Sequence, residues 1–320
     1  MAGSRRGPRD EAPRRKGMTR YAVVTVPVAD LRRRPVEAEP LNIHDDLEES
    51  QVLFHESLIV REETARWYRV EAPEQPRFAG PEGWQGYPGW VRKKDAAEME
   101  NPVPHDGVVK SAFALVRPKP VDAGPPLFPV SLGTRLSIKG EAKGFFEIGL
   151  EGEKTGWVAK KEIARKPEAL PRAGLSGDLV RAARLFLGAA YLWGGRSMPL
   201  PWSRGPVMGV DCSGLTNLVF RACHMDIPRD AHDQWAKAAA IAPEELGPGD
   251  LIFLSREGQA DAINHVMLSL GSDRFIEAQQ TGDVVRIRSF RERFGLDLEG
   301  LGQAAFTVQK RKLCFGRITP

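Results

Sequence analysis

Cysteine is scarce in this sequence. Three cysteines occur among its 320 residues, and they are odd in number and far apart: Cys212, Cys223 and Cys314. This arrangement argues against a disulfide framework and favours a reducing compartment. Cys212, Cys223 and His224 also lack the spacing of a zinc site, and no second pair of ligands accompanies them. We therefore expect no structural disulfide and no metal, and no cofactor is implied.

Long apolar stretches are missing as well. No run reaches the roughly 18 apolar residues that a membrane-spanning helix needs. Residues 1–18 contain several arginines but no apolar segment behind them, so they do not resemble a secretory signal. We expect a cytoplasmic protein that does not insert into membranes.

Outside the N-terminal segment, the chain has no net charge. The formal net charge is +4, and residues 1–18, with six Lys/Arg against Asp10 and Glu11, hold all of it. The rest of the chain is balanced, which provides no basic groove for a nucleic acid. We expect residues 1–18 to form a basic, disordered, solvated tail, and we expect no nucleic-acid partner.

Two segments of the N-terminal half present the same features in the same order. Each contains short alternating, β-branched stretches between Gly/Pro turns, and each ends in Gly-Trp-Val, at Trp90 and at Trp157. This repetition predicts two small all-β barrels, at residues 19–100 and 101–166, with both tryptophans in the barrel cores. The first barrel is the longer one, and its additional residues fall in loops, where function tends to reside.

The pattern changes after a Pro-rich linker at residues 167–175. Ser176 is expected to cap a helix that ends near Gly188, and the segment that follows Cys212 has the same helical period. Strand-like stretches occupy the remainder of the chain. A helix that carries a cysteine, followed by an antiparallel sheet, predicts an α+β domain over residues 176–320.

Cys212 is expected in the first turn of its helix. Unpaired N–H groups and the helix dipole favour an anion there, by about 1 kcal/mol, whereas a thiolate at neutral pH needs roughly 3 kcal/mol. A nearby imidazolium must supply the difference. Among the six histidines, His265 opens a predicted strand and would project from a rigid element. A cysteine on a helix end that faces such a histidine is typical of papain-like nucleophilic catalysis.

A third polar group should hold the imidazole, and Glu277 on the adjacent predicted strand is the candidate. Phe275 and Glu277 share one face of that strand, so an acid stands where an apolar residue is expected. Another reading stays open. Glu277 could be an ordinary solvent-facing acid, and the third member of the catalytic group would then be Gln279 or Gln280.

Six short motifs follow one another in the C-terminal half: Tyr-Leu-Trp-Gly-Gly, Val-Asp-Cys-Ser-Gly-Leu, Ile-Pro-Arg-Asp-Ala-His-Asp-Gln, Gly-Asp-Leu-Ile-Phe-Leu, His-Val-Met-Leu-Ser-Leu-Gly and Phe-Ile-Glu-Ala. Together, these motifs resemble those of the NlpC-type cysteine peptidases of bacterial peptidoglycan. With two SH3-like barrels ahead of the catalytic domain, the chain is most similar to the γ-D-glutamyl-L-diamino acid endopeptidases of the dipeptidyl-peptidase VI type.

The resemblance implies a role for each candidate residue. Cys212 would be the nucleophile, His265 the general base and Glu277 the third member, a position that is commonly histidine in the family. Tyr191 would help the backbone N–H of Cys212 to stabilise the oxyanion. The residues implied to bind the substrate near its amino end are Glu49, Tyr87, Asp211, Ser213 and Asp230. The long segment at 196–209 departs from the family pattern.

The implied function is hydrolysis of the γ-D-Glu–diamino acid bond in peptidoglycan-derived peptides with a free N-terminal L-Ala, as in muropeptide recycling. Peptides of the type L-Ala-γ-D-Glu-diamino acid are the expected partners. Two alternatives remain open at this point. The chain could be an exported hydrolase of the intact wall, or a non-catalytic SH3-like protein that binds wall or peptide.

Overall fold

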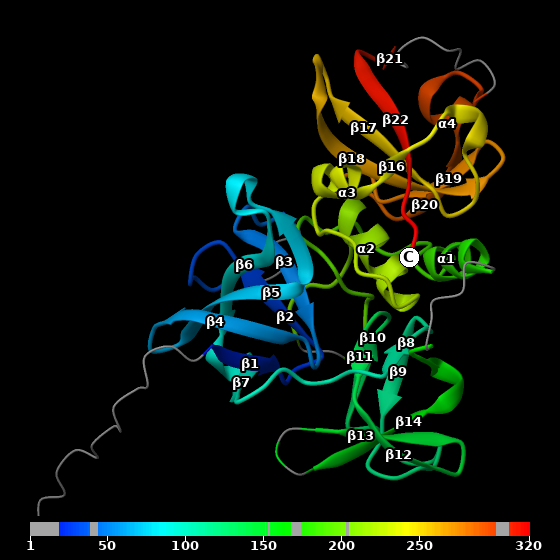
Figure 1. Ribbon diagram of the computed structural model, residues 1–320. Coiled ribbons are helices and arrows are strands. Elements are labelled where there is room, and N and C mark those ends of the chain that lie inside the picture. The colour runs from blue at the N-terminus through cyan, green and yellow to red at the C-terminus, as the bar shows by residue number, and fades with distance from the viewer. Residues whose placement is uncertain are drawn as a thin grey trace, which may run out of the picture.

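The structure is a computed structural model, and it describes residues 19–38, 44–150, 152, 154–167, 174–202, 205–298 and 307–320. Figure 1 shows three units: a first β-unit beside the C-terminal unit, and a second β-unit below it. The predicted tail at 1–18 lies outside the described residues, as does most of the predicted linker. None of the helices in the described residues combines the length and the apolar character needed to cross a lipid bilayer.

The first β-unit is a single antiparallel sheet of short strands. The sheet order is β3-β2-β6-β5-β4-β1-β7, and its inward side chains, such as Leu31 and Val91, are fully buried. The strands are β1 (Arg20–Val24), β2 (Val28–Arg32), β3 (Glu48–Leu53), β4 (Ser57–Glu63), β5 (Trp67–Phe78), β6 (Trp84–Arg92) and β7 (Ala96–Met99). Short 3₁₀ turns occur at Gly80–Glu82 and Lys93–Asp95.

The second β-unit consists of three smaller antiparallel sheets, in the orders β10-β9, β11-β8-β15 and β12-β13-β14. Its strands are β8 (Gly107–Val109), β9 (Phe113–Val116), β10 (Phe128–Ser131), β11 (Arg135–Leu136), β12 (Ile138–Ala142), β13 (Phe145–Gly149), β14 (Thr155–Ala159) and β15 (Ile163–Arg165), with a 3₁₀ turn at Lys160–Glu162. The prediction of an all-β N-terminal half is confirmed.

The prediction that Trp90 and Trp157 fill the cores of the two β-units is wrong. Both side chains are only half-buried, whereas the neighbouring Val91 and Val158 are fully buried. Successive side chains of a strand point to opposite faces. In each Gly-Trp-Val motif, therefore, the valine faces the core and the tryptophan lies on the outer side.

In the part of the chain that the structure describes, the C-terminal unit combines four helices with one antiparallel sheet in the order β16-β22-β17-β18-β19-β20, and β21 pairs with β22. The helices are α1 (Leu175–Arg184), α2 (Cys212–Ala222), α3 (Ala231–Lys237) and α4 (Phe290–Phe294), with a 3₁₀ turn at Pro243–Glu245. The strands are β16 (Ala239–Ala240), β17 (Leu251–Arg256), β18 (Gln259–Gly271), β19 (Arg274–Glu277), β20 (Arg286–Ser289), β21 (Thr307–Val308) and β22 (Arg311–Arg317). The predicted α+β layout is confirmed.

The start of α1 differs from the prediction. Its N-cap is Gly174, with φ of 85°, and no side chain caps the helix. A left-handed φ of this kind strongly favours glycine, so the chain enters the helix through Gly174. Ser176 lies inside the first turn and is not the cap. The helix also ends at Arg184, before the predicted end at Gly188.

Helices cover both faces of the C-terminal sheet. On one face, Leu215 of α2 belongs to the same core as Val266 and Ile276. On the other, Phe290 of α4 packs edge-on against Phe275. All residues of α2 are buried, because the helix lies between the sheet and the two β-units. Its first residue is thereby held in a fixed place.

Buried ion pairs join the three units. Arg196 lies 2.6 Å from Glu56 of the first β-unit, and both side chains are almost completely buried. Arg221 of α2 lies 2.8 Å from Glu74 of the first β-unit. Arg221 also donates a hydrogen bond of 2.7 Å to the carbonyl oxygen of Gly133 in the second β-unit. Breaking a buried pair by removing one partner costs about 3–5 kcal/mol, so these contacts fix the β-units on the C-terminal unit.

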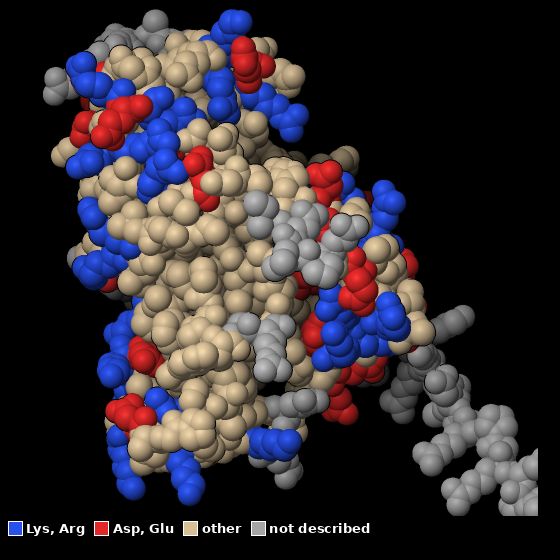
Figure 2. All heavy atoms as spheres, turned by 180° about the vertical axis from the view of Figure 1, so that it is seen from behind, with Lys and Arg blue, Asp and Glu red and all other residues tan. Residues whose placement is uncertain are grey.

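Charged side chains of both signs are mixed on the face of the molecule seen in Figure 2. They gather over the upper part, where the C-terminal sheet lies, and over the first β-unit. The middle of this face carries few of them. No large area of a single sign is visible in this view.

Candidate active site

Cys212 begins α2, and the residues around it explain why this turn has its sequence. Asp211 is the N-cap, and its Oδ1 accepts a hydrogen bond of 2.7 Å from the backbone N–H of Gly214. A Cβ atom on Gly214 would lie 2.2 Å from the carbonyl oxygen of Gly195. Only glycine fits there. The Asp-Cys-Ser-Gly sequence thus places the thiol at the positive end of a buried helix.

His265 lies on β18 between two partners. Its Nε2 is 2.9 Å from Oε2 of Glu277, and the thiol of Cys212 is its other hydrogen-bond partner. Burial by itself lowers the pKa of His265. The hydrogen bonds and charges of Cys212 and Glu277 outweigh that effect and raise the pKa to about 9. The imidazole is therefore charged at neutral pH, as a thiolate–imidazolium pair requires.

Glu277 is completely buried on β19. Its Oε1 lies 3.5 Å from Nε of Arg288 and 3.3 Å from Nε of Arg293. Burial raises the pKa of Glu277, but His265 and the two arginines more than offset this and lower it. The carboxylate thus stays ionised beside the imidazole. The alternative that Glu277 faces solvent is wrong, and sequence reasoning did not find the two arginines.

One cleft of about 480 Å³ brings the candidate residues together. Its walls come from the first β-unit, from the entry to α2 and α3, and from the sheet. All predicted site residues line it except Glu277, which lies behind His265. The lining residues predicted from the sequence are Glu49, Tyr87, Tyr191, Asp211, Cys212, Ser213, Asp230 and His265.

Acidic groups concentrate where the first β-unit meets α3. The hydroxyl of Tyr87 donates to both carboxylate oxygens of Asp230, at 3.1 and 3.2 Å. Burial raises the pKa of Asp230, although the charge of Arg229 opposes the shift. Glu49 forms an ion pair with Arg33 on the same wall. Asp230, in contrast, has no ion-pair partner among the described residues.

Asp211 is not available as a free acid. Its two oxygens accept hydrogen bonds of 3.0 and 2.7 Å from the guanidinium of Arg229, which is almost completely buried. Arg229 also donates to the hydroxyls of Ser213 and Ser50, at 3.0 and 2.7 Å. Sequence reasoning missed Arg229, although it directly precedes Asp230. It neutralises Asp211 and ties α2 to the first β-unit.

Glu48 is a second residue of the cleft that the sequence did not single out. It is buried, and its Oε1 has no hydrogen-bond partner among the described residues, while Oε2 lies 3.3 Å from Arg32. Burial and the charge of Asp30 raise the pKa of Glu48 well above its usual range. The carboxyl of Glu48, with one oxygen lacking a partner, thus differs from that of the adjacent Glu49, which forms an ion pair with Arg33.

Tyr191 lies in the segment that precedes α2 and faces the cleft. A β-bridge to Val210 holds its backbone beside the entry to the helix. Burial and the negative charges of Asp211 and Cys212 raise the pKa of the Tyr191 phenol. Its hydroxyl therefore stays protonated and remains a hydrogen-bond donor near the thiol.

Comparison with known proteins identifies the family of this chain. The family model described as NlpC/P60 family matches residues 188–297. The chain is also 31% identical over 275 residues to the γ-D-glutamyl-L-lysine dipeptidyl-peptidase of Bacillus subtilis (strain 168), and the match covers 84% of this chain and 85% of that protein. This chain belongs to the NlpC/P60 family. The resemblance inferred from the sequence motifs is thus confirmed, and the chain is a cysteine peptidase.

Two further proteins are similar to this chain. A Bacillus cereus (strain ATCC 10987 / NRS 248) protein of the same name as the Bacillus subtilis enzyme is 26% identical over 245 residues, which is 75% of this chain and 69% of that protein. The solved structure of an NlpC/P60 family protein from Bacillus cereus ATCC 10987 superposes with a TM-score of 0.75 at 22% identity. It covers 94% of this chain and 100% of the other, so the fold is shared across all three units.

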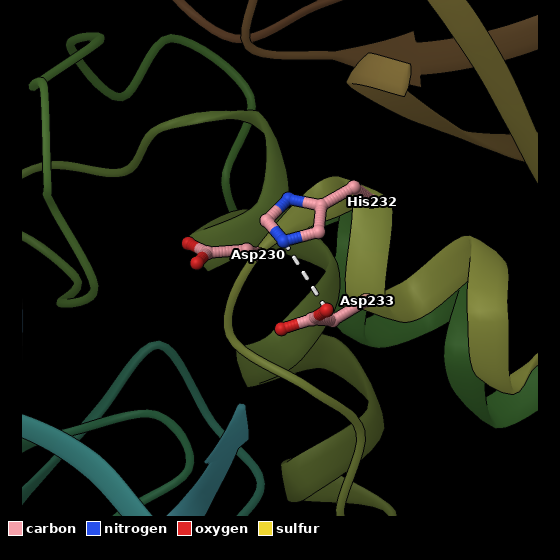
Figure 3. A group of neighbouring side chains, drawn as sticks. All are labelled: Asp230, His232 and Asp233. Carbon is pink, nitrogen blue, oxygen red and sulfur yellow. Dashed lines mark ion pairs between the residues drawn. The ribbon is translucent and has the colours of Figure 1, made fainter. Parts of the chain in front are cut away.

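A group of three side chains beside the cleft has the composition of a metal site. The ligand atoms of Asp230, His232 and Asp233 lie within 4.8 Å of one another, and Figure 3 shows the His232 ring facing the carboxylate of Asp233, with Asp230 to one side. All three side chains are engaged. His232 lies 3.2 Å from Asp233, Asp233 accepts from the backbone N–H of Phe78 at 3.0 Å, and Tyr87 donates to Asp230. These contacts attach α3 to the first β-unit, and we assign no metal to the group.

Proposed function

We propose that this NlpC/P60 peptidase hydrolyses the γ-D-Glu–diamino acid bond of peptidoglycan-derived peptides that have a free N-terminal L-Ala. The observation that carries the proposal is the composition of the cleft. The Cys212 and His265 pair shares the cleft with Asp230, a half-buried acid that accepts hydrogen bonds from the hydroxyl of Tyr87 in the first β-unit. The names of the Bacillus relatives specify the same γ-D-glutamyl bond, followed by L-lysine.

In the first half of the proposed reaction, the thiolate of Cys212 attacks the γ-carbonyl carbon of D-Glu. The carbonyl electron pair moves to oxygen, and the oxyanion accepts hydrogen bonds from the backbone N–H of Cys212 and the hydroxyl of Tyr191. Collapse of the tetrahedral intermediate breaks the C–N bond. The imidazolium of His265 gives its proton to the leaving amine, and a thioester to Cys212 remains.

In the second half, neutral His265 takes a proton from water, and the hydroxide attacks the thioester carbonyl. The C–S bond breaks, the thiolate and the imidazolium are restored, and L-Ala-D-Glu leaves. Glu277 keeps its charge throughout, because its role is to orient the imidazole and to stabilise the imidazolium.

The amino end of the substrate has a natural partner in Asp230. This half-buried acid has no ion-pair partner among the described residues, and the free α-ammonium of L-Ala would supply one. Asp211 cannot take this role, because Arg229 already holds both of its oxygens. The first β-unit then closes the cleft after two substrate residues. Stem peptides linked to sugar would not fit, so we place the enzyme in muropeptide recycling, in the cytoplasm, and not on the intact wall.

The test compares L-Ala-γ-D-Glu-diaminopimelate with its N-acetylated form. Acetylation deletes the charge and adds bulk at the closed end, so we expect kcat/KM to fall by about a hundredfold or more. Purified sacculi should release no fragments. The Cys212→Ala variant serves as the control for background hydrolysis. Equal cleavage of both peptides, or release of fragments from sacculi, would contradict the proposal and favour a wall hydrolase with an open cleft.

A further inference from the structure

The cleft has a second wall, opposite the first β-unit, that the roles described so far leave unused. It is formed where β17, β18 and β22 run side by side. Leu254 of β17 pairs with His265 of β18 on one side and with Leu313 of β22 on the other. Two residues further along their strands lie Arg256 and Arg311, which face the same cleft as Cys212.

Arg311 is held firmly in this wall. Its Nε donates a hydrogen bond of 2.5 Å to the carbonyl oxygen of Ser255, and one of its terminal nitrogens donates a hydrogen bond of 2.8 Å to Oδ1 of Asn264. Burial and the charge of Arg293 lower the pKa of Arg311, while Cys212 is among the groups whose charge opposes this. The guanidinium is thus half-buried and within electrostatic range of the nucleophile.

Neither Arg256 nor Arg311 forms an ion pair with a carboxylate in the part of the chain that the structure describes. This distinguishes them from the other arginines of the cleft: Arg33 is paired with Glu49, and Arg293 with Glu277. The two unpaired guanidiniums make this wall positive. Asp230 lines the same cleft from the side of α3 and the first β-unit, so the cleft has a negative and a positive wall as well as Cys212 and His265.

If the amino end of the peptide lies against Asp230, as the proposed function requires, the residue that follows the cleaved bond lies against the positive wall. We propose that Arg256 and Arg311, together with Asn264, form the binding site for the leaving residue. This site selects a diamino acid with a second carboxylate, such as diaminopimelate, over lysine.

The charges of the two residues support this choice. At the end of a tripeptide, lysine carries one carboxylate and one side-chain ammonium, so its net charge is zero. Diaminopimelate carries two carboxylates and one ammonium, so it has one net negative charge. Guanidinium groups bind carboxylates through paired, charge-assisted hydrogen bonds. They repel the lone ammonium of a lysine side chain.

The experiment measures kcat/KM for three tripeptides that share L-Ala-γ-D-Glu and end in diaminopimelate, in diaminopimelate with its side-chain carboxylate converted to carboxamide, or in L-lysine. We expect the first to exceed the other two by about tenfold or more, the worth of one charge-assisted pair. Arg256→Gln combined with Arg311→Gln should bring the three values within about threefold of one another.

Controls separate a local effect from a general one. Arg256 is exposed, so Arg256→Gln alone should fold normally and lower the preference partway. Lys310→Gln removes the same charge next to Arg311 but outside the cleft lining, and it should leave the preference unchanged. Equal rates for the three peptides, or an unchanged preference in the double variant, would overturn this inference and leave the proposed function intact. Failure to cleave any of them would overturn the proposed function itself.

Discussion

The two β-units follow the same pattern of short antiparallel strands, yet they serve the peptidase in different ways. The first lines the cleft through Glu49 and Tyr87. Within the described residues, the second contributes no side chain to the cleft lining. Instead it packs beneath α2, where the carbonyl oxygen of Gly133 accepts a hydrogen bond from Arg221. One copy of the pattern lines the cleft that holds Cys212 and His265, and the other supports the helix that carries the thiol.

This comparison sorts substitutions into three kinds. Changes in the catalytic group should slow every substrate alike. Changes where the first β-unit meets the cleft should alter the discrimination between free and N-acetylated peptides. Changes in the second β-unit should lower stability and leave both rates alone. Five predictions test this division, beginning with the largest effect.

Cys212→Ala should reduce the hydrolysis of every peptide to background, a loss of about four orders of magnitude or more, because no other group can form the thioester. The folded state should persist, as judged by circular dichroism and thermal melting. Cys223→Ala and Cys314→Ala are the matched controls. Burial raises the pKa of the Cys223 thiol to about 12 and also raises that of Cys314, so both variants should retain activity. Loss of activity in either control would mean that the thiol has been misassigned.

Asp230→Asn should lower kcat/KM for the free tripeptide by about a hundredfold, since a buried ammonium would lose its counter-charge. Tyr87→Phe removes only the hydroxyl that orients the carboxylate, so about tenfold is expected. In both variants the slow cleavage of the N-acetylated peptide should scarcely change. An equal loss for the two peptides would show that the first β-unit only supports the structure.

Glu277→Gln should slow free and acetylated peptides by the same factor, about 10- to 100-fold, because it weakens the support of His265 and leaves the amino-end site intact. Steady-state rates on both peptides measure this. If the ratio of the two rates shifted, Glu277 would have a role in substrate discrimination that we do not assign to it.

The same variant should change the pH dependence. The folded pKa of His265 is about 9, above its unfolded value of about 6.5. The imidazolium therefore contributes stability that is fully present below about pH 6.5 and is lost as the pH rises toward 9. Without the carboxylate the pKa of His265 falls, so the alkaline limb of the pH–rate profile should move to lower pH. An unmoved alkaline limb would mean that another group controls it.

Gly133→Ala should have the smallest effect on catalysis. The added Cβ would lie 3.0 Å from Cδ2 of Leu218, at a φ of 82° that disfavours side chains. Gly144 has the same φ with nothing within 4 Å of its Cβ position, so Gly144→Ala is the matched control for backbone strain. In urea unfolding, both should lose about 1 kcal/mol, and Gly133→Ala about 1 kcal/mol more. Unchanged kcat/KM in both variants is expected, and a rise in KM would place the second β-unit in the substrate site.

The sequence predicted those site residues whose position follows from the pattern of their own helix or strand. Cys212 was predictable because a helical period follows a glycine-bracketed turn. Glu277 was predictable because strand alternation puts an acid on the face of Phe275. Arg288 and Arg293 were not, because their contact with Glu277 depends on how β20 and α4 pack against β19.

Arg229 illustrates the same limit at the amino end of the cleft. It comes from the loop before α3, reaches Asp211 at the start of α2, and contacts Ser50 of the first β-unit. The residue pattern of a single segment cannot reveal a contact that joins three segments of the chain. The prediction that Trp90 and Trp157 fill the cores was wrong for a different reason. Trp90 and Trp157 are large apolar residues, but the pairing register decides which face of a strand is inward, and that register is not visible in the strand's own sequence.

The buried pairs Arg196–Glu56 and Arg221–Glu74 also bear on how such an enzyme can change over time. Deleting the first β-unit would leave the guanidiniums of Arg196 and Arg221 buried without these carboxylate partners. The loss would destabilise the fold as a whole, not only change the substrate specificity. The first β-unit is therefore not a removable accessory that could be exchanged between proteins as a cassette. Its surface loops, in contrast, can vary freely around the fixed pairs, so we expect related enzymes to acquire new substrate preferences by remodelling those loops rather than by replacing the unit.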